Sequence, residues 1–425
     1  MIKAFLYERF KGFDSSVLWL EQVTTLVGTN AAGKSNAIEG MQILSELATG
    51  RDLSVIFDGT NNSEASIRGG AKGCCRFTAK SFTLGCLIDL NDEYDLLYRV
   101  SISAAGRIAI DDESLHIVRN GNTNAVNGKL IFRTASSTSA EDSGDISVEY
   151  ANGKRGTNPQ CRAIRSMSVL SQMKGKLPSD IEKYDETIRH IQTVQSSLMG
   201  IFILDPIPAM MHGYSRIGDT SLRRNCSNVS AVLYALKESK NTDEWYRFLD
   251  IVSHLPENEI KGIDFVKTAL NDVILVQKEL NGKVSANIDA ARLSDGTLRC
   301  IAVLAAVMCE PEYSLIAIEE LDNGIHPSRV KELMRALSDI ARSRHIDLVV
   351  TTHNVTMLNG MQKEDILGVS VAYRDADTNA SRFIPFVEIQ HQEAILASGG
   401  IGDALESDSL LQLIKEKKEY KAFEF

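Results

Sequence analysis

The chain has 425 residues, of which 44% are hydrophobic, so it has room for two or three domains with substantial cores. Its 46 basic and 56 acidic residues give a formal net charge of −10, which excludes a general electrostatic attraction to nucleic acid. No apolar run reaches membrane-spanning length, and the N-terminus lacks a signal peptide's apolar core and cleavage site. We therefore expect a cytoplasmic protein with no membrane contact.

The seven cysteines include no C-x-x-C pair and are odd in number, which suits neither a disulfide framework nor a zinc site. Any contact with DNA must be local. The candidates are two basic clusters, for which a solvated face is the simpler interpretation: Arg216, Arg223 and Arg224, and Lys415, Lys417 and Lys418.

The first informative stretch lies near the N-terminus. Val23 to Val27 is a short aliphatic and β-branched run typical of a buried strand, and "GTNAAGKS" follows with the spacing G-x-x-x-x-G-K-S. After Lys34, apolar residues recur at helical spacing at Ala37, Ile38, Met41, Leu44 and Leu47. The order strand, glycine loop and helix favours a phosphate-binding loop over an ordinary turn.

In such a loop, backbone N–H groups at the helix N-terminus bind an anion that the helix dipole also favours. Gly28 and Gly33 allow the tight turn, Lys34 reaches the β- and γ-phosphates, and the Ser35 hydroxyl coordinates magnesium. The predicted nucleotide contacts are Gly28, Asn30, Ala31, Ala32, Gly33, Lys34, Ser35 and Asn36.

Between Gly73 and Ala291 the sequence changes character. Polar, alternating stretches with Asn-Gly and Asp-rich turns predict antiparallel strands that end near Gln172. Residues Leu177 to Ser197 and Ser221 to Leu280 are predicted to form amphipathic helices, without a sustained heptad array.

A second helix N-terminus follows at "RLSDGTLRCIAVLAAVM". Ser294 or Asp295 can cap a long apolar helix, and Gly296 leaves the backbone open, so this is a second candidate anion site. A single subunit has no obvious need for two such sites.

Two adjacent carboxylates end the next predicted strand, Leu315 to Ile318. We expect Glu319 to bind the metal through its water shell and Glu320 to polarise an attacking water, although paired acids at a strand end also occur on solvated edges.

The βαβ unit is completed by a helix after Pro327 and a strand from Leu348 to Asn354. Glu320 and His353 then lie at C-terminal strand ends, where parallel sheets bind ligands, so His353 is a candidate to hydrogen-bond the γ-phosphate or the attacking water.

The four motifs GTNAAGKS, LSDGT, IAIEELDNGIHP and TTHN occur in this order, and the chain thereby resembles an ABC-class ATPase head of the SMC, RecF and OLD-like kind. The resemblance implies that GTNAAGKS is the Walker A loop, LSDGT the signature segment, IAIEE the Walker B strand, Leu321 to His326 the D-loop and His353 the switch histidine, with ATP and Mg²⁺ as ligands. It also implies that Ser294, Asp295 and Gly296 act in trans on ATP held by another subunit, in a homodimer or higher homo-oligomer.

The resemblance implies an α/β fold: a mixed or parallel core sheet, an antiparallel β subdomain and an inserted helical lid, here without a long coiled coil. The expected divisions are residues 1–72 and 291–425 for the two parts of the core, 73–172 for the β subdomain and 173–290 for the helical insertion. Gln172 is either the family's γ-phosphate and metal-sensing glutamine or a plain surface residue. In this family the adenine is held by residues near the N-terminal strands, which makes Arg9 and Lys11 candidates for adenine contacts.

Three functions are compatible with these observations. The first is an ATPase whose oligomer controls a separate effector, a nuclease or toxin, in bacterial antiphage defence. The second is a RecF-like DNA-binding repair ATPase. The third, an OLD-like nuclease, needs the D-x-D in "AYRDADTNASRF" to be a metal site, whereas "DADTN" is better interpreted as a hairpin turn.

Overall fold

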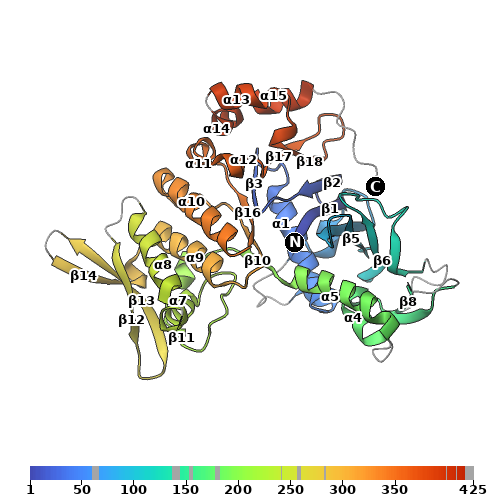
Figure 1. Cartoon of the computed structure of the whole chain (residues 1–425), viewed down its shortest axis with the longest axis horizontal. Helices are drawn as coiled ribbons and strands as arrows, with labels where there is room; N and C mark the ends of the chain where they lie inside the picture. The colour runs from blue at the N-terminus through green and yellow to red at the C-terminus, as the bar shows by residue number, and fades with distance from the viewer. Residues whose placement is uncertain are drawn as a thin grey trace.

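The computed structural model describes residues 1–59, 67–135, 144–152, 157–177, 182–240, 242–255, 260–281, 284–398, 400–407 and 409–416. Figure 1 shows a central region with an antiparallel sheet on the right, a smaller sheet and helices on the left, and the C-terminal helices at the top. No helix in these ranges is long and apolar enough to cross a membrane.

The central region is built on a mixed sheet of six strands. Their order is β10 (Ile201–Leu204), β15 (Leu315–Ile318), β16 (Asp347–Thr351), β3 (Val23–Gly28), β17 (Val369–Arg374) and β18 (Ser381–Pro385). Neighbouring strands are parallel except for β18, which is antiparallel to β17. The strands predicted at Val23 and Leu315 are confirmed. The strand predicted to reach Asn354 ends at Thr351, because the Asn354 side chain caps the following helix by accepting a hydrogen bond from the Met357 N–H.

Both faces of the core sheet are covered. Along β15 and β16, Ala317 and Val349 face one apolar cluster while Ile318 and Val350 face another, which is why these strands are continuously apolar. Since β16 lies between β3 and β15 and is parallel to both, the C-terminal ends of all three strands lie at the same edge of the sheet.

The second sheet is antiparallel and has eight strands. Their order is β2 (Phe13–Trp19), β1 (Ile2–Phe10), β4 (Ser81–Asp89), β5 (Tyr94–Ser103), β6 (Ala109–Arg119), β7 (Lys129–Thr134), β8 (Asp145–Tyr150) and β9 (Gln160–Ile164). The predicted β subdomain therefore also includes the two N-terminal strands. Helix α1 (Lys34–Ala48) packs between this sheet and the core sheet, and the Tyr7 hydroxyl donates a 3.1 Å hydrogen bond to the Ala37 carbonyl oxygen.

The insertion differs from its prediction. It contains the helices α7 (Val229–Glu238) and α8 (Thr242–His254). The prediction of helix as far as Leu280 is wrong beyond His254. There the chain forms a sheet of four strands: β11 (Ser215–Arg216), β12 (Ile260–Lys267), β13 (Asp272–Asn281) and β14 (Val284–Asp289). The run from Val273 to Val276 is apolar and largely β-branched, and such residues pack better in strands than in helices.

The other α-helices are α2 (Leu53–Asp58), α3 (Gly70–Cys74), α4 (Val169–Lys176), α5 (Asp185–Met199), α6 (Pro208–Met211), α9 (Asp295–Cys309), α10 (Pro327–Ser343), α11 (Val355–Asn359), α12 (Lys363–Ile366), α13 (Gln392–Ser398), α14 (Ile401–Glu406) and α15 (Ser409–Glu416). Short 3₁₀ turns cover Glu182–Tyr184, Ala290–Arg292 and Phe386–Glu388. The longest described helix, α10, has 17 residues, so the described ranges contain no long coiled coil.

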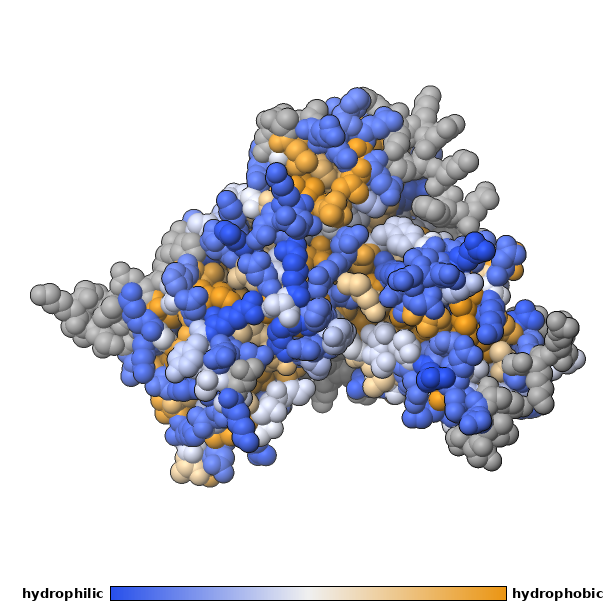
Figure 2. All heavy atoms as spheres, in the orientation of Figure 1, coloured by the Kyte–Doolittle hydropathy of each residue, from blue (hydrophilic) through white to orange (hydrophobic). Residues whose placement is uncertain are grey.

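The C-terminal helices form a third apolar cluster with β17, and Figure 2 shows hydrophobic side chains between them in an otherwise largely hydrophilic face. The molecule is an α/β fold with a mixed core sheet, an antiparallel β subdomain and an inserted region of helices and strands.

Candidate nucleotide site

The N-terminus of α1 is shaped by glycines. Gly28 has φ +140°, and a Cβ there would lie 2.1 Å from the Ala372 carbonyl oxygen on β17, so no larger residue fits. Gly33, with φ +115°, is the N-cap residue, and no side chain caps the helix. The first N–H groups of α1 are therefore free of side-chain capping and directed where an anion can bind.

Lys34 begins α1 and is only 7% exposed. Its Nζ donates hydrogen bonds of 2.8 Å to the Gly28 carbonyl oxygen and 3.1 Å to the Thr29 carbonyl oxygen, which hold the ammonium group inside the loop. Burial lowers the pKa of Lys34 to about 8, against the opposing effect of the negative charges of Glu320 and Asp322. A bound phosphate group would favour the charged form of Lys34 and so raise its pKa.

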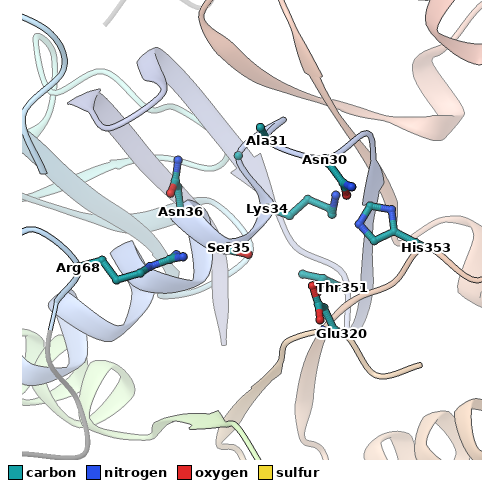
Figure 3. A pocket seen from close by; sticks show the side chains of 10 residues that line it. Asn30, Ala31, Lys34, Ser35, Asn36, Arg68, Glu320, Thr351 and His353 are labelled. Carbon is teal, nitrogen blue, oxygen red and sulfur yellow. The ribbon is translucent and has the colours of Figure 1, made fainter. Parts of the chain in front are cut away.

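A pocket of about 380 Å³ lies in front of this loop (Figure 3). It brings together residues from the loop after β3, the start of α1, the segment before α3 and the C-terminal ends of β15 and β16: Asn30, Ala31, Gly33, Lys34, Ser35, Asn36, Arg68, Glu320, Thr351 and His353. Eight of these ten were predicted from the sequence, and Arg68 and Thr351 were not. Gly28 and Ala32 belong to the same loop but do not line the pocket.

The two acids after β15 diverge. Glu320 faces the pocket with Lys34, whereas Glu319 lines a neighbouring cavity of about 220 Å³ with Asp205 and Arg224. Burial raises the pKa of Glu319, and the Arg68 and Arg224 charges oppose that shift. Arg68 lines both cavities, so the two cavities adjoin at this side chain.

His353 enters the pocket opposite Glu320. Burial lowers its pKa, and the nearby Lys34 charge lowers it further. The imidazole is therefore neutral at physiological pH, when one ring nitrogen donates a hydrogen bond and the other accepts one.

Among the described residues, no group of three or more His, Cys, Asp or Glu side chains is arranged to hold a metal ion by itself. Magnesium that enters with a nucleotide needs only one or two protein ligands, because phosphate oxygens and water supply the others. Ser35 and Glu319 fit that requirement, with a hydroxyl in the pocket and a carboxylate in the adjoining cavity.

Residues 23–359 match the model of the family described as "AAA domain, putative AbiEii toxin, Type IV TA system". The chain belongs to this family. No match was found among curated proteins.

The chain is also similar to solved SMC head structures. The SMC head bound to the C-terminal winged-helix domain of ScpA is 14% identical with a TM-score of 0.49, and the alignment covers 90% of this chain and 97% of that one. The SMC head from Thermotoga maritima is 14% identical (TM-score 0.42; 90% and 98% covered), and the SMC head with an extended coiled coil bound to the C-terminal domain of ScpA from Pyrococcus furiosus is 13% identical (TM-score 0.45; 90% and 95% covered).

In this member of the AAA-domain family, Gln172 does not reach the pocket. It lies on α4, where its Oε1 accepts a 2.9 Å hydrogen bond from the Ile164 N–H and its Nε2 donates one of 2.9 Å to the Ile164 carbonyl oxygen. The side chain thus closes the turn between β9 and α4 and lines neither cavity. Asp205, directly after β10, occupies the strand end beside Glu319.

The signature segment also lies outside the pocket. Ser294 caps α9, with its Oγ accepting a 3.2 Å hydrogen bond from the Thr297 N–H, and both Ser294 and Asp295 are exposed. Gly296 is buried, and a Cβ there would lie 2.5 Å from the Gly324 carbonyl oxygen. The glycine therefore lets α9 approach the D-loop of its own chain, and the predicted role in trans remains a prediction.

The other candidates have structural partners. Arg224 donates a 2.7 Å hydrogen bond to Gln42 Oε1 beside Glu319 and is not a free surface cation, while Arg223 pairs with Asp219 at 2.7 Å. Lys11 forms a 2.5 Å ion pair with Glu39. Arg9 and Arg216 line neither cavity, the Lys415 side chain is not described, and Lys417 and Lys418 lie outside the described residues.

Asp375 closes a hairpin turn. Its Oδ1 accepts hydrogen bonds from the N–H of Asp377 at 3.2 Å and of Thr378 at 2.8 Å, as the turn interpretation of the D-x-D predicts.

Proposed function

We propose that this protein binds and hydrolyses ATP, and that its nucleotide-dependent oligomer acts as a sensor that regulates a separate effector. The observation that carries the ATPase function is the single pocket that combines an uncapped helix N-terminus, the buried Lys34, Glu320 and the neutral His353. Phosphoryl transfer needs little beyond such positioning and electrostatic stabilisation.

In this proposal the first N–H groups of α1 bind the phosphates and Lys34 neutralises the β- and γ-oxygens. Glu320 accepts the proton of the attacking water, and His353 donates a hydrogen bond to the γ-phosphate or orients that water. Ser35 and, through water, Glu319 and Asp205 would hold magnesium, which would supply charge neutralisation when bound. Arg68 stands where it can approach the phosphates from the opposite wall.

The exposed N-terminus of α9 supports a composite site. Ser294 and Asp295 are exposed and line neither of the two cavities, and the N–H groups at the start of α9, with the Ser294 hydroxyl, suit an anion held by a second subunit. The proposed assembly is a homodimer or a higher homo-oligomer in which each α9 completes a neighbour's ATP site.

The effector is proposed to be a nuclease or toxin of a bacterial antiphage system. The family description "putative AbiEii toxin, Type IV TA system" applies to proteins that share this chain's own domain; it favours a toxin–antitoxin setting over DNA repair and does not identify a separate effector. The hairpin role of Asp375 gives no support to a nuclease within this chain.

The decisive experiment compares ATP binding and steady-state hydrolysis by wild-type, Lys34→Ala and Glu320→Gln proteins. Glu320→Gln should keep ATP affinity and slow turnover by about 100-fold or more, because an amide cannot act as a general base. Equal loss of binding and turnover would assign Glu320 a structural role instead. Strong stimulation of turnover by DNA would favour the repair function.

The defence role is tested in cells that carry the native gene cluster. Protection against phage infection should be lost with either variant, while plasmids with the unchanged gene retain it. Undiminished protection by both variants would show that ATP turnover is not what controls the effector.

A further inference from the structure

Glu320 has an unusual backbone conformation. Its φ is +48°, in the left-handed region that residues with a Cβ rarely adopt. The residue stands at the start of a tight turn, in which the Asn323 N–H donates a 2.9 Å hydrogen bond to the Glu320 carbonyl oxygen. Something in the surroundings must hold this conformation, because it costs free energy.

Thr351 makes the contacts that hold it. Its Oγ1 accepts a 2.8 Å hydrogen bond from the Glu320 N–H, and its carbonyl oxygen accepts one of 3.1 Å from the Leu321 N–H. Regular pairing of β15 with β16 ends at Ile318 and Val350, one residue before Thr351. The threonine hydroxyl thus extends the contact between the two strands past the end of their ladder.

The sheet itself does not require this hydroxyl. Thr351 is the last residue of β16 and is 2% exposed, an environment in which the isosteric valine packs equally well in a strand. Figure 3 shows Thr351 and Glu320 side by side below Lys34, on the wall of the phosphate pocket. The hydroxyl group is therefore placed to control the direction of the Glu320 carboxylate.

We propose that Thr351 is a positioning residue whose hydroxyl fixes the left-handed turn at Glu320 and so directs the carboxylate toward the water that attacks ATP. This inference rests on the proposed ATPase function. Thr351 acts on the reaction through Glu320 and contributes nothing to ATP affinity.

The test compares Thr351→Val, which removes the hydroxyl and keeps the shape, with Thr351→Ser, which keeps the hydroxyl. Thr351→Val should lower kcat by about 10-fold to 100-fold with an unchanged Kd for ATP, because a small misplacement of a reacting group has effects of this size. Thr351→Ser should retain most of the turnover. A valine variant with normal kcat, or a serine variant as impaired as the valine variant, would overturn the proposal.

A double variant separates positioning from direct binding. If Thr351 acts only through Glu320, adding Thr351→Val to Glu320→Gln should slow residual turnover no further. An additional loss of turnover or of ATP affinity would show instead that Thr351 contacts the nucleotide itself.

Two controls keep the outcomes distinct. An unchanged Kd for ATP verifies that Thr351→Val is folded, and Thr351→Ala carries the same expectation if the valine variant does not fold. If Glu320→Gln alone hydrolyses ATP normally, the proposed function of Glu320 fails. If Glu320→Gln is slow and Thr351→Val is not, only the inference about Thr351 fails.

Discussion

The N-termini of α1 and α9 differ in how they begin and in what surrounds them. Each begins a 15-residue helix, with Gly33 directly before α1 and Gly296 as the second residue of α9. At α1 the N-cap residue is Gly33, without a capping side chain, and the first turn faces a pocket with Glu320 and His353. At α9 Ser294 caps its own helix, lies exposed and lines neither of the two cavities described above.

The difference shows how one local motif serves two purposes. An uncapped helix end leaves N–H donors without an intrahelical acceptor, and a bound phosphate can accept their hydrogen bonds. The α1 end can therefore bind a ligand in a pocket that the same chain forms. A capped end is stable without a ligand and can meet one brought by another molecule. The variants below test whether the second end is used in this way.

The largest effect is expected on ATP turnover, when the N-terminus of α1 is altered in one chain and the N-terminus of α9 in another. Ser294→Glu should place a negative charge against a neighbour's γ-phosphate and abolish turnover, while its own Walker A loop still binds ATP. Lys34→Ala should be inactive for the opposite reason. Mixed one to one, the two variants should recover about a quarter of wild-type turnover, because half of random dimers are mixed and each has one intact site.

Steady-state ATPase across mixing ratios checks this expectation, with mixed oligomers verified by size. Activity that never exceeds that of the separate variants would remove the composite site. Gly296 is unsuitable for the experiment, since a Cβ there would lie 2.5 Å from the Gly324 carbonyl oxygen of the same chain and disturb the D-loop.

A smaller effect is expected on ATP affinity. Lys34→Ala removes charge-assisted hydrogen bonds to two phosphates and should raise Kd by about 100-fold or more. Ser294→Ala should leave the Kd of the isolated subunit unchanged. Equilibrium binding of a fluorescent ATP analogue measures both, and equal effects would erase the distinction between the two helix ends.

The α1 site should also respond to pH. Lys34 has a pKa of about 8 without nucleotide, and bound phosphates favour its charged form, so binding above pH 8 must take up a proton. ATP affinity should therefore be constant below pH 8 and fall as pH rises, to about 10-fold weaker at pH 9 than at pH 7. Lys34→Arg should bind more weakly but without this decline, because arginine stays charged. A decline in both proteins would assign the titration to another group.

The smallest effect concerns the cap of α9. Ser294→Ala should lower the free energy of unfolding by about 1 kcal/mol through loss of the bond from the Thr297 N–H, and Ser294→Thr should restore most of it. Chemical denaturation measures this change. Gly33→Ala gives no matched comparison, since φ +115° strains any residue with a Cβ.

The sequence predicts the parts of the site that depend on neighbouring residues. The loop from Gly28 to Ser35 and the strand before Glu319 are recognisable because strand, turn and helix signals occur within a few residues. The position of His353 in the site is also predictable, because the parallel strands β15 and β16 place their C-terminal residues at one edge of the sheet.

The parts that depend on the order of strands are not predictable in this way. Asp205 lies beside Glu319 only because β10 joins the sheet next to β15, and four residues of strand within a region of helices give a weak signal. Arg68 is held beside the pocket by Glu39, whose Oε1 accepts a 2.8 Å hydrogen bond from the Arg68 N–H. The two residues are 29 positions apart, and no local sequence pattern predicts this contact. Gln172 has the residue type expected of a phosphate sensor, but the turn after β9 uses its amide group.

The place of β3 in the core sheet has a consequence for the timing of folding during synthesis. β3 begins at Val23 and pairs only with β16, which begins at Asp347, and β17, which begins at Val369. All strands of the eight-stranded sheet lie before Arg165, so its strand pairing can form while the ribosome is still making the remainder. Until late in translation, helix α1 is then packed on the antiparallel sheet on one face, while its other face, which packs on the core sheet in the complete protein, stays uncovered. A nascent chain that stops before Asp347 has the phosphate loop but neither of the strands that pair with β3, so ATP can act as a folding ligand only for the nearly completed protein.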